Sequence, residues 1–134
     1  MVKYIAQIWI LTIITSPLVL ALVLGIIINN SSLSEIFESY EIIILMILVG
    51  SLFSIPAMVV FGLIQRSLKS SIPIWRRKLL LSIYSFLSVW ITFYIVDEGF
   101  ITRWTDQTVW PLIYSLIIVI GVWIFRLPNT NSVV

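Results

Sequence analysis

Four long apolar stretches dominate this sequence and limit what it can fold into. They cover residues 5–28, 42–64, 79–96 and 109–125, and none contains Asp, Glu, Lys or Arg. A helix needs about 20 apolar residues to cross the hydrocarbon core of a bilayer. Each stretch must be helical there, because the bilayer interior offers the backbone no hydrogen-bond partners. We therefore predict an all-α integral membrane protein with four transmembrane helices.

The composition excludes an ordinary soluble domain. Of the 134 residues, 60% are hydrophobic and 10% are charged, whereas soluble domains are typically about half apolar and about a quarter charged. The short chain indicates one transmembrane domain over residues 1–134. The first stretch follows Lys3 and is longer than the roughly 7–15 apolar residues of a signal peptide, so we expect it to be retained as a span.

The charged residues predict the orientation. If the N-terminus is cytoplasmic, seven of the eight basic residues lie inside and only Arg103 lies outside, with all six acidic residues. Basic residues in short loops favour the cytoplasmic side. We therefore predict two in-out-in hairpins with both termini in the cytoplasm. The net charge of +2 is the sum of a basic and an acidic face, so it does not indicate a nucleic-acid partner. The Ile-rich composition without Cys or His suggests a bacterial inner membrane.

The loop between the first two stretches carries a helix-start signal. Ser32 and Glu35 have the spacing of a capping box. Apolar side chains then recur with helical period at Leu33, Ile36, Phe37 and Tyr40. Two interpretations stay open: a short helix on the membrane surface, or the frayed start of the second span.

The loop over residues 65–78 is strongly basic and contains Pro73, which interrupts a continuous helix. Basic residues near an anionic leaflet contribute about 1 kcal/mol each. We interpret them as a topology anchor, with anionic-lipid or partner binding as the alternative. The residues concerned are Arg66, Lys69, Arg76, Arg77 and Lys78.

The loop over residues 97–108 is the most polar part of the chain. It carries both signs of charge beside aromatic residues that suit a membrane interface. The simpler interpretation is a solvated turn, and the alternative is a contact site for an extracytoplasmic partner. Its candidate residues are Asp97, Glu98, Arg103 and Asp106.

Small and hydroxyl-bearing residues mark faces of the second and third spans. Gly50 and Ser54 are four residues apart, which allows two helix backbones to approach closely. Ser85, Ser88 and Thr92 share one helical face. We expect these residues to join helices through packing and hydrogen bonds, and the alternative is the lining of a pore in an oligomer.

Proline stands near the middle of two spans, at Pro17 and Pro56. Each frees a backbone carbonyl, so both are candidate kinks. No ionisable residue lies within any span, and this disfavours a proton-coupled pump with an internal carboxylate.

No catalytic motif is present. The chain has no His and no Cys, and it lacks Walker, GxSxG and HExxH patterns. Its six carboxylates lie in or beside the outer loops with no spacing typical of a metal site. We therefore predict a non-enzymatic protein without a cofactor.

Three functions fit this plan. The first is an inner-membrane effector that self-associates and perturbs the membrane when triggered, as in antiphage abortive infection or a toxin. The second is a membrane-embedded binding protein, such as an immunity protein or an accessory subunit of a membrane complex. The third is a small oligomeric transporter or channel. The plan is similar to that of small bacterial immunity proteins and multi-span antiphage effectors, a likeness of architecture alone.

Overall fold

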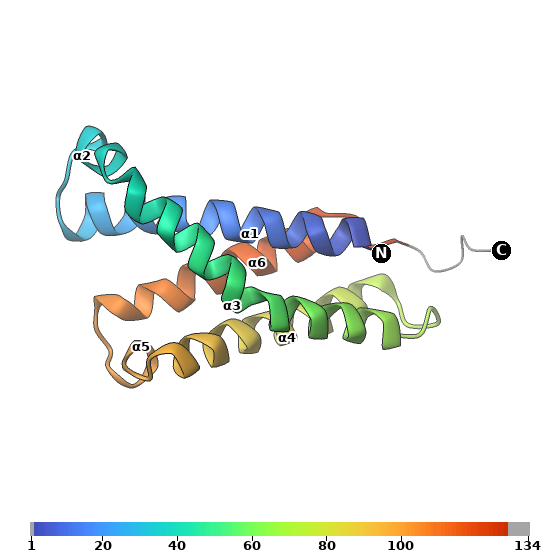
Figure 1. Ribbon diagram of the computed structural model, residues 1–134. Coiled ribbons are helices and arrows are strands. Elements are labelled where there is room, and N and C mark those ends of the chain that lie inside the picture. The colour runs from blue at the N-terminus through green and yellow to red at the C-terminus, as the bar shows by residue number, and fades with distance from the viewer. Residues whose placement is uncertain (1, 129–134) are drawn as a thin grey trace.

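The computed structural model describes residues 2–128, which form a bundle of four long helices (Figure 1). Each is long and apolar enough to span a membrane, which confirms the predicted fold class. The long helices are α1 (Val2–Leu22), which continues as the π-helix η1 (Val23–Ile28), α3 (Tyr40–Ser67), α4 (Ile74–Val96) and α6 (Val109–Ile124). The short helices are α2 (Leu33–Glu38), α5 (Gly99–Thr102) and the 3-10 turn η2 (Asp106–Thr108).

The helix bounds differ most from the prediction in α4. We predicted its start at residue 79, after the basic cluster, but α4 begins at Ile74, directly after Pro73. Its first turns therefore carry Arg76, Arg77 and Lys78. Long basic side chains at a helix end keep their charged groups near the membrane surface while their stems cover apolar atoms, so charge does not stop the helix.

The two ends of the bundle carry opposite charge. The N-terminus, the α3–α4 turn and the end of α6 lie at one end (Figure 1), and α2, α5 and η2 lie at the other. We call the first the basic end and the second the acidic end. The basic end holds Lys3, Arg66, Lys69, Arg76, Arg77, Lys78 and Arg126, and the acidic end holds all six carboxylates and Arg103. That the basic end faces the cytoplasm stays a prediction.

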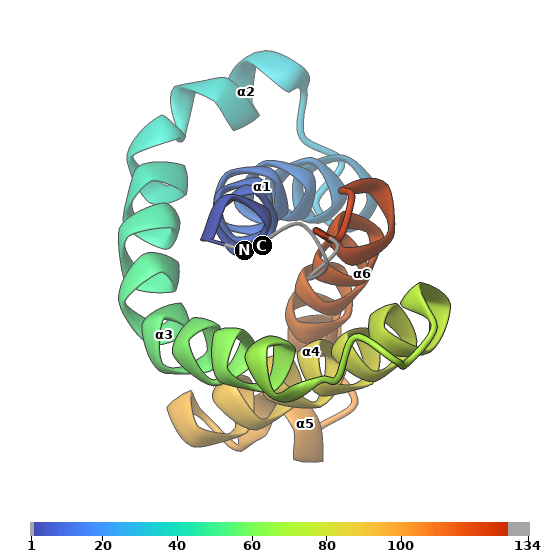
Figure 2. The ribbon, with the colours of Figure 1, turned by 90° about the vertical axis from the view of Figure 1, so that its right-hand side faces the viewer.

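The four long helices form a ring in which α3 is the least buried member. Helix α6 packs against α1 and α4, and α3 closes the ring by contacting both α1 and α4. Viewed along the bundle, α3 curves around one side (Figure 2). Only 6% of its apolar stretch is buried inside the bundle, against 33% for α6. Helix α3 is therefore the least tightly packed of the four long helices.

The tightest packing lies at the basic end. A buried apolar cluster there joins α1, α3, α4, α6 and Leu127 just after α6, and we call it the basic-end core. Its members are Tyr4, Ile8, Phe61, Leu81, Val122 and Leu127. The Tyr4 hydroxyl donates a hydrogen bond of 2.9 Å to the Val122 carbonyl, so even the polar atom of this core joins two helices.

The capping-box signal marks a separate short helix. The Ser32 hydroxyl accepts from the Glu35 amide, and the Glu35 carboxylate accepts from the Ser32 amide. Helix α2 ends before Ser39, and α3 begins at Tyr40, so α2 is distinct from the second span. Ile36 is buried against Gly25 of the π-helix, where a Cβ atom would lie 2.5 Å from the Ile36 Cδ1 atom. Glycine at that position lets α2 dock on η1.

The two mid-span prolines occupy different surroundings. Pro17 is buried within α1, whereas Pro56 lies within α3 and is exposed. Helix α3 changes direction near its middle (Figure 1), and Pro56 stands close to the middle of its 28 residues. The π-helix begins six residues beyond Pro17.

Candidate functional site

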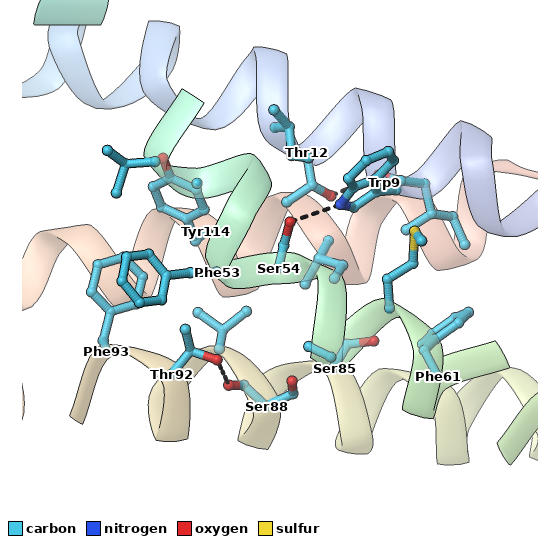
Figure 3. Close-up of a pocket in the computed structure, with 18 of the residues that line it drawn as sticks. Trp9, Thr12, Phe53, Ser54, Phe61, Ser85, Ser88, Thr92, Phe93 and Tyr114 are labelled. Atoms are coloured by element: carbon cyan, nitrogen blue, oxygen red, sulfur yellow. Dashed lines mark hydrogen bonds between the residues drawn. The ribbon is translucent and has the colours of Figure 1, made fainter. Parts of the chain in front are cut away.

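A cavity of about 310 Å³ lies inside the bundle and is walled by all four long helices (Figure 3). It runs from Phe61 and Tyr84 near the basic-end core toward Phe100 and Trp110 at the acidic end. Along α4 its lining extends from Tyr84 to Val96, which is roughly 18 Å of helix. The volume falls at the lower end of the range for small-molecule sites, about 300–1,000 Å³.

The walls of the cavity are mainly apolar and aromatic. Phe93 meets the Phe100 and Tyr114 rings edge to face, with centroid distances of 5.2 Å and 5.5 Å. On the α3 side, Leu45 and Phe53 line the cavity although they are 59% and 51% exposed. The cavity therefore reaches the outer surface of the bundle along α3.

The hydroxyl stripe of α4 faces this cavity. Ser85, Ser88 and Thr92 all line it, and the Thr92 hydroxyl donates to the Ser88 carbonyl at 2.8 Å (Figure 3). Ser85 is 1% exposed, and its hydroxyl has no hydrogen-bond partner among residues 2–128. Ser85 is therefore buried within one chain, whereas Ser88 and Thr92 are half-buried.

The small residues of α3 line the same cavity from another helix. The Trp9 indole donates to the Ser54 hydroxyl at 2.7 Å, and Ser54 in turn donates to the Ser51 carbonyl at 3.0 Å. A Cβ atom on Gly50 would lie 3.8 Å from the Tyr114 hydroxyl oxygen. The structure therefore brings together Gly50, Ser54, Ser85, Ser88 and Thr92 around one space.

Several aromatic residues of the site were missed by the sequence analysis. Trp9 and Tyr114 line the cavity, as does Tyr84, whose hydroxyl donates to the Ala57 carbonyl at 3.0 Å. Polar aromatic side chains usually find a hydrogen-bond partner when they are buried. Their positions well inside the apolar stretches were the signal that could have revealed them.

The five basic candidates of the α3–α4 segment have different surroundings. Arg66, Lys69 and Arg76 are exposed, and the Arg76 guanidinium lies 5.2 Å from the centre of the Trp75 ring. Arg77 is buried. The Lys78 ammonium donates to the Trp123 and Phe125 carbonyls at 3.0 Å and 3.1 Å, so it satisfies carbonyls at the end of α6.

The outer-loop candidates lie away from the apolar cavity. Asp97, Glu98, Arg103 and Asp106 are all exposed, and none lines it. The Asp97 carboxylate accepts a hydrogen bond of 2.8 Å from the Gly99 amide at the start of α5. Within residues 2–128, no three carboxylates lie close enough together to hold a metal ion.

The cavity can hold an apolar molecule, and among residues 2–128 its lining has no carboxylate, amine, guanidinium, imidazole or thiol. Its polar groups are hydroxyls, an indole and backbone atoms. Comparisons with known proteins found no matching family model, curated protein or solved structure. The geometry of the site is therefore the basis for proposing a function.

Proposed function

We propose that this protein is a membrane-embedded binding protein that holds an apolar molecule, taken from the bilayer, in the cavity between its four long helices. The observation that carries this proposal is the cavity of about 310 Å³ inside the bundle. Protein interiors are normally packed to the density of organic crystals and contain few large voids. A void of this size in a small bundle is better explained as a binding space than as a packing fault.

The surroundings of the cavity support an apolar ligand. The bilayer supplies apolar chains at high concentration, and the cavity reaches the bundle surface beside Leu45 and Phe53 of α3. The loosely packed α3 offers a route of lateral exchange that leaves the basic-end core intact. The Ser85 hydroxyl, which has no partner among residues 2–128, is one of the few polar groups on a mainly apolar lining. The proposal assigns no chemical reaction to the site.

Filling the cavity tests this proposal. Ser88 lines the cavity, whereas its neighbour Leu87 is exposed on the outer face of α4. We expect the wild-type protein and Leu87→Phe to co-purify from membranes with a near-stoichiometric apolar molecule. Ser88→Phe should lose it, because the added ring occupies the same space. Organic extraction of the purified proteins followed by mass spectrometry measures this difference.

The comparison of the two variants also defines the result that would contradict the proposal. Equal extracts from wild type, Leu87→Phe and Ser88→Phe would show that the associated lipid lies outside the cavity. A circular-dichroism spectrum of each variant verifies that the helices persist, so that a lost ligand is not confused with a lost fold.

A second candidate function is the self-associating membrane effector. The observation that favours it is an exposed apolar ridge along α3, which a second copy of the chain would cover. Its residues are spaced four, three, four and four apart and so share one face. They are Leu48, Leu52, Ile55, Val59 and Leu63.

Cysteine crosslinking distinguishes this candidate, since the chain has no native cysteine. Leu52→Cys should give a disulfide-linked dimer in membranes, and the exposed Leu116→Cys on α6 should not. The effector function further requires that expression depolarises cells and that Leu52→Arg abolishes this effect. Equal crosslinking at both positions would indicate random collision and would remove the support for self-association through α3.

A further inference from the structure

Two buried side chains at the basic end have polar atoms without hydrogen-bond partners. Gln65 near the end of α3 is 1% exposed, and Arg77 in the first turn of α4 is 2% exposed. Among residues 2–128, neither the Gln65 amide nitrogen nor its oxygen has a partner, and the same is true of the Arg77 Nε atom. Neither residue lines the cavity described above. Buried polar groups of folded proteins are almost always paired, so this pair requires an explanation.

The helical register places each side chain one turn from a member of the basic-end core. Gln65 follows Phe61 by four residues on α3, and Arg77 precedes Leu81 by four residues on α4, so each shares a face with that neighbour. Phe61 and Leu81 both belong to the basic-end core. Gln65 and Arg77 therefore both lie one helical turn beyond this core, toward the basic surface.

Among residues 2–128, no carboxylate lies at this end of the bundle. All six carboxylates of the chain lie at or beside the acidic end. The first turn of α4 contains no acidic residue, and Pro73 at its N-cap has no side chain that can accept a hydrogen bond. A helix N-terminus itself carries a partial positive charge. A buried cation without an opposite charge is strongly unfavourable, so the site favours an anion from outside the chain.

We propose that Arg77 and Gln65 form a binding site for one phosphate group at the basic end of the bundle. A guanidinium presents a planar set of N–H donors that matches a phosphate. The Gln65 amide adds a further donor, and the free N–H groups at the start of α4 favour an anion there. Two sources have this chemistry: the head group of an anionic phospholipid and free inorganic phosphate.

Thermal unfolding of the whole chain in a neutral detergent tests the site. Tryptophan fluorescence reports Tm while one of three probes is titrated: short-chain phosphatidylglycerol, diacylglycerol with the same chains, or inorganic phosphate. We expect phosphatidylglycerol to raise Tm by several degrees and diacylglycerol to leave it unchanged. A shift with phosphatidylglycerol alone identifies the lipid head group as the source, and an equal shift with inorganic phosphate identifies the free anion.

Two adjacent arginines provide a matched control. Arg77→Gln should weaken binding of the phosphate-bearing probe at least about tenfold, because a charge-assisted interaction is lost. Arg76→Gln, at the exposed neighbour, should change it less than about twofold, as expected of a surface charge. Gln65→Leu should weaken binding about threefold while raising Tm without ligand, because it removes an unpaired buried amide.

Three results would overturn the site. The first is a Tm that neither phosphate-bearing probe changes. The second is an equal loss of binding in Arg76→Gln and Arg77→Gln, which would mean diffuse surface attraction. The third result applies if Arg77→Gln does not fold. In that case Gln65→Leu is the deciding variant, and an unchanged affinity of Gln65→Leu for the phosphate-bearing probe would overturn the site.

Discussion

The two halves of the bundle are held together by different forces. In the basic half, side-chain hydrogen bonds join residues far apart in sequence, as in Tyr4 to Val122 and Lys78 to Trp123. In the acidic half, the side-chain hydrogen bonds of the described residues connect positions at most five apart. Helix contacts there depend on aromatic rings such as those of Phe93 and Phe100.

This difference shows how a small membrane bundle can be stable at one end and still have room for a ligand beyond it. Hydrogen bonds fix the spacing of helices at the basic end. Two of these long-range bonds, from Trp9 and Tyr84, join residues that line the cavity on that side. Helix α3 belongs to both regions: Tyr84 bonds it to α4 and Trp9 bonds it to α1, whereas Leu45 and Phe53 beyond these bonds line the cavity and are exposed. A wall that is fixed at one end and loose at the other suits lateral uptake of an apolar ligand.

The largest effect is expected from the basic-end core. Leu81→Ala should lower the free energy of unfolding by about 2–4 kcal/mol, because it creates a cavity at a fully buried position. Leu80→Ala, at the exposed neighbour, should change it by less than about 0.5 kcal/mol. Reversible unfolding of both variants in mixed micelles measures the difference. Equal effects would contradict the view that this end supplies the stability.

A smaller effect is expected at the end of α6. Lys78→Met removes both hydrogen bonds to the Trp123 and Phe125 carbonyls and should cost about 1–2 kcal/mol, since the acceptors lose a charged donor. Lys69→Met, at an exposed position in the turn, serves as the charge-matched control and should be neutral. Amide hydrogen exchange over the last turn of α6 should speed up in Lys78→Met only. Faster exchange in both variants would point to a general charge effect.

The smallest effect is expected where α3 meets α4. Tyr84→Phe removes the hydrogen bond to the Ala57 carbonyl and should cost about 0.6 kcal/mol, a usual value inside membranes. Tyr94→Phe, on an exposed side chain, is its control. Loosening α3 in this way should also speed ligand exchange, which the off-rate of a bound fluorescent fatty acid reports. An unchanged off-rate would mean that α3 does not control access.

The sequence was enough to predict the spans and much less informative about their faces. Charge-free length located all four helices, and the Ser32–Glu35 spacing located α2. The sequence showed that Ser85, Ser88 and Thr92 share one helical face. It did not show which part of the molecule that face contacts. In a transmembrane helix, the positions that face lipid and those that face the bundle interior are both apolar. The spacing of apolar residues along the sequence therefore does not distinguish the two faces.

Adjacent residues illustrate what the sequence hides. Arg76 and Arg77 look alike in the chain, yet one is exposed and the other buried. The outcome depends on the direction in which α4 leaves Pro73 and on its rotation against α3 and α6. These are properties of the packed bundle and not of the local sequence. The cavity likewise depends on the inclination of α3, for which no local pattern exists.

Photolabelling inside the membrane would locate the ligand itself. A fatty acid carrying a diazirine in its chain is incorporated into membranes that contain the wild-type protein, and the labelled residues are then identified by mass spectrometry. If the cavity binds an apolar chain, the label should concentrate on cavity-lining positions of α4 such as Val89 and Thr92. Competition by an unlabelled fatty acid should remove it. Labelling confined to the exposed positions Leu87 and Ile91, and insensitive to competition, would show that the bilayer merely surrounds the bundle and would contradict the proposed function.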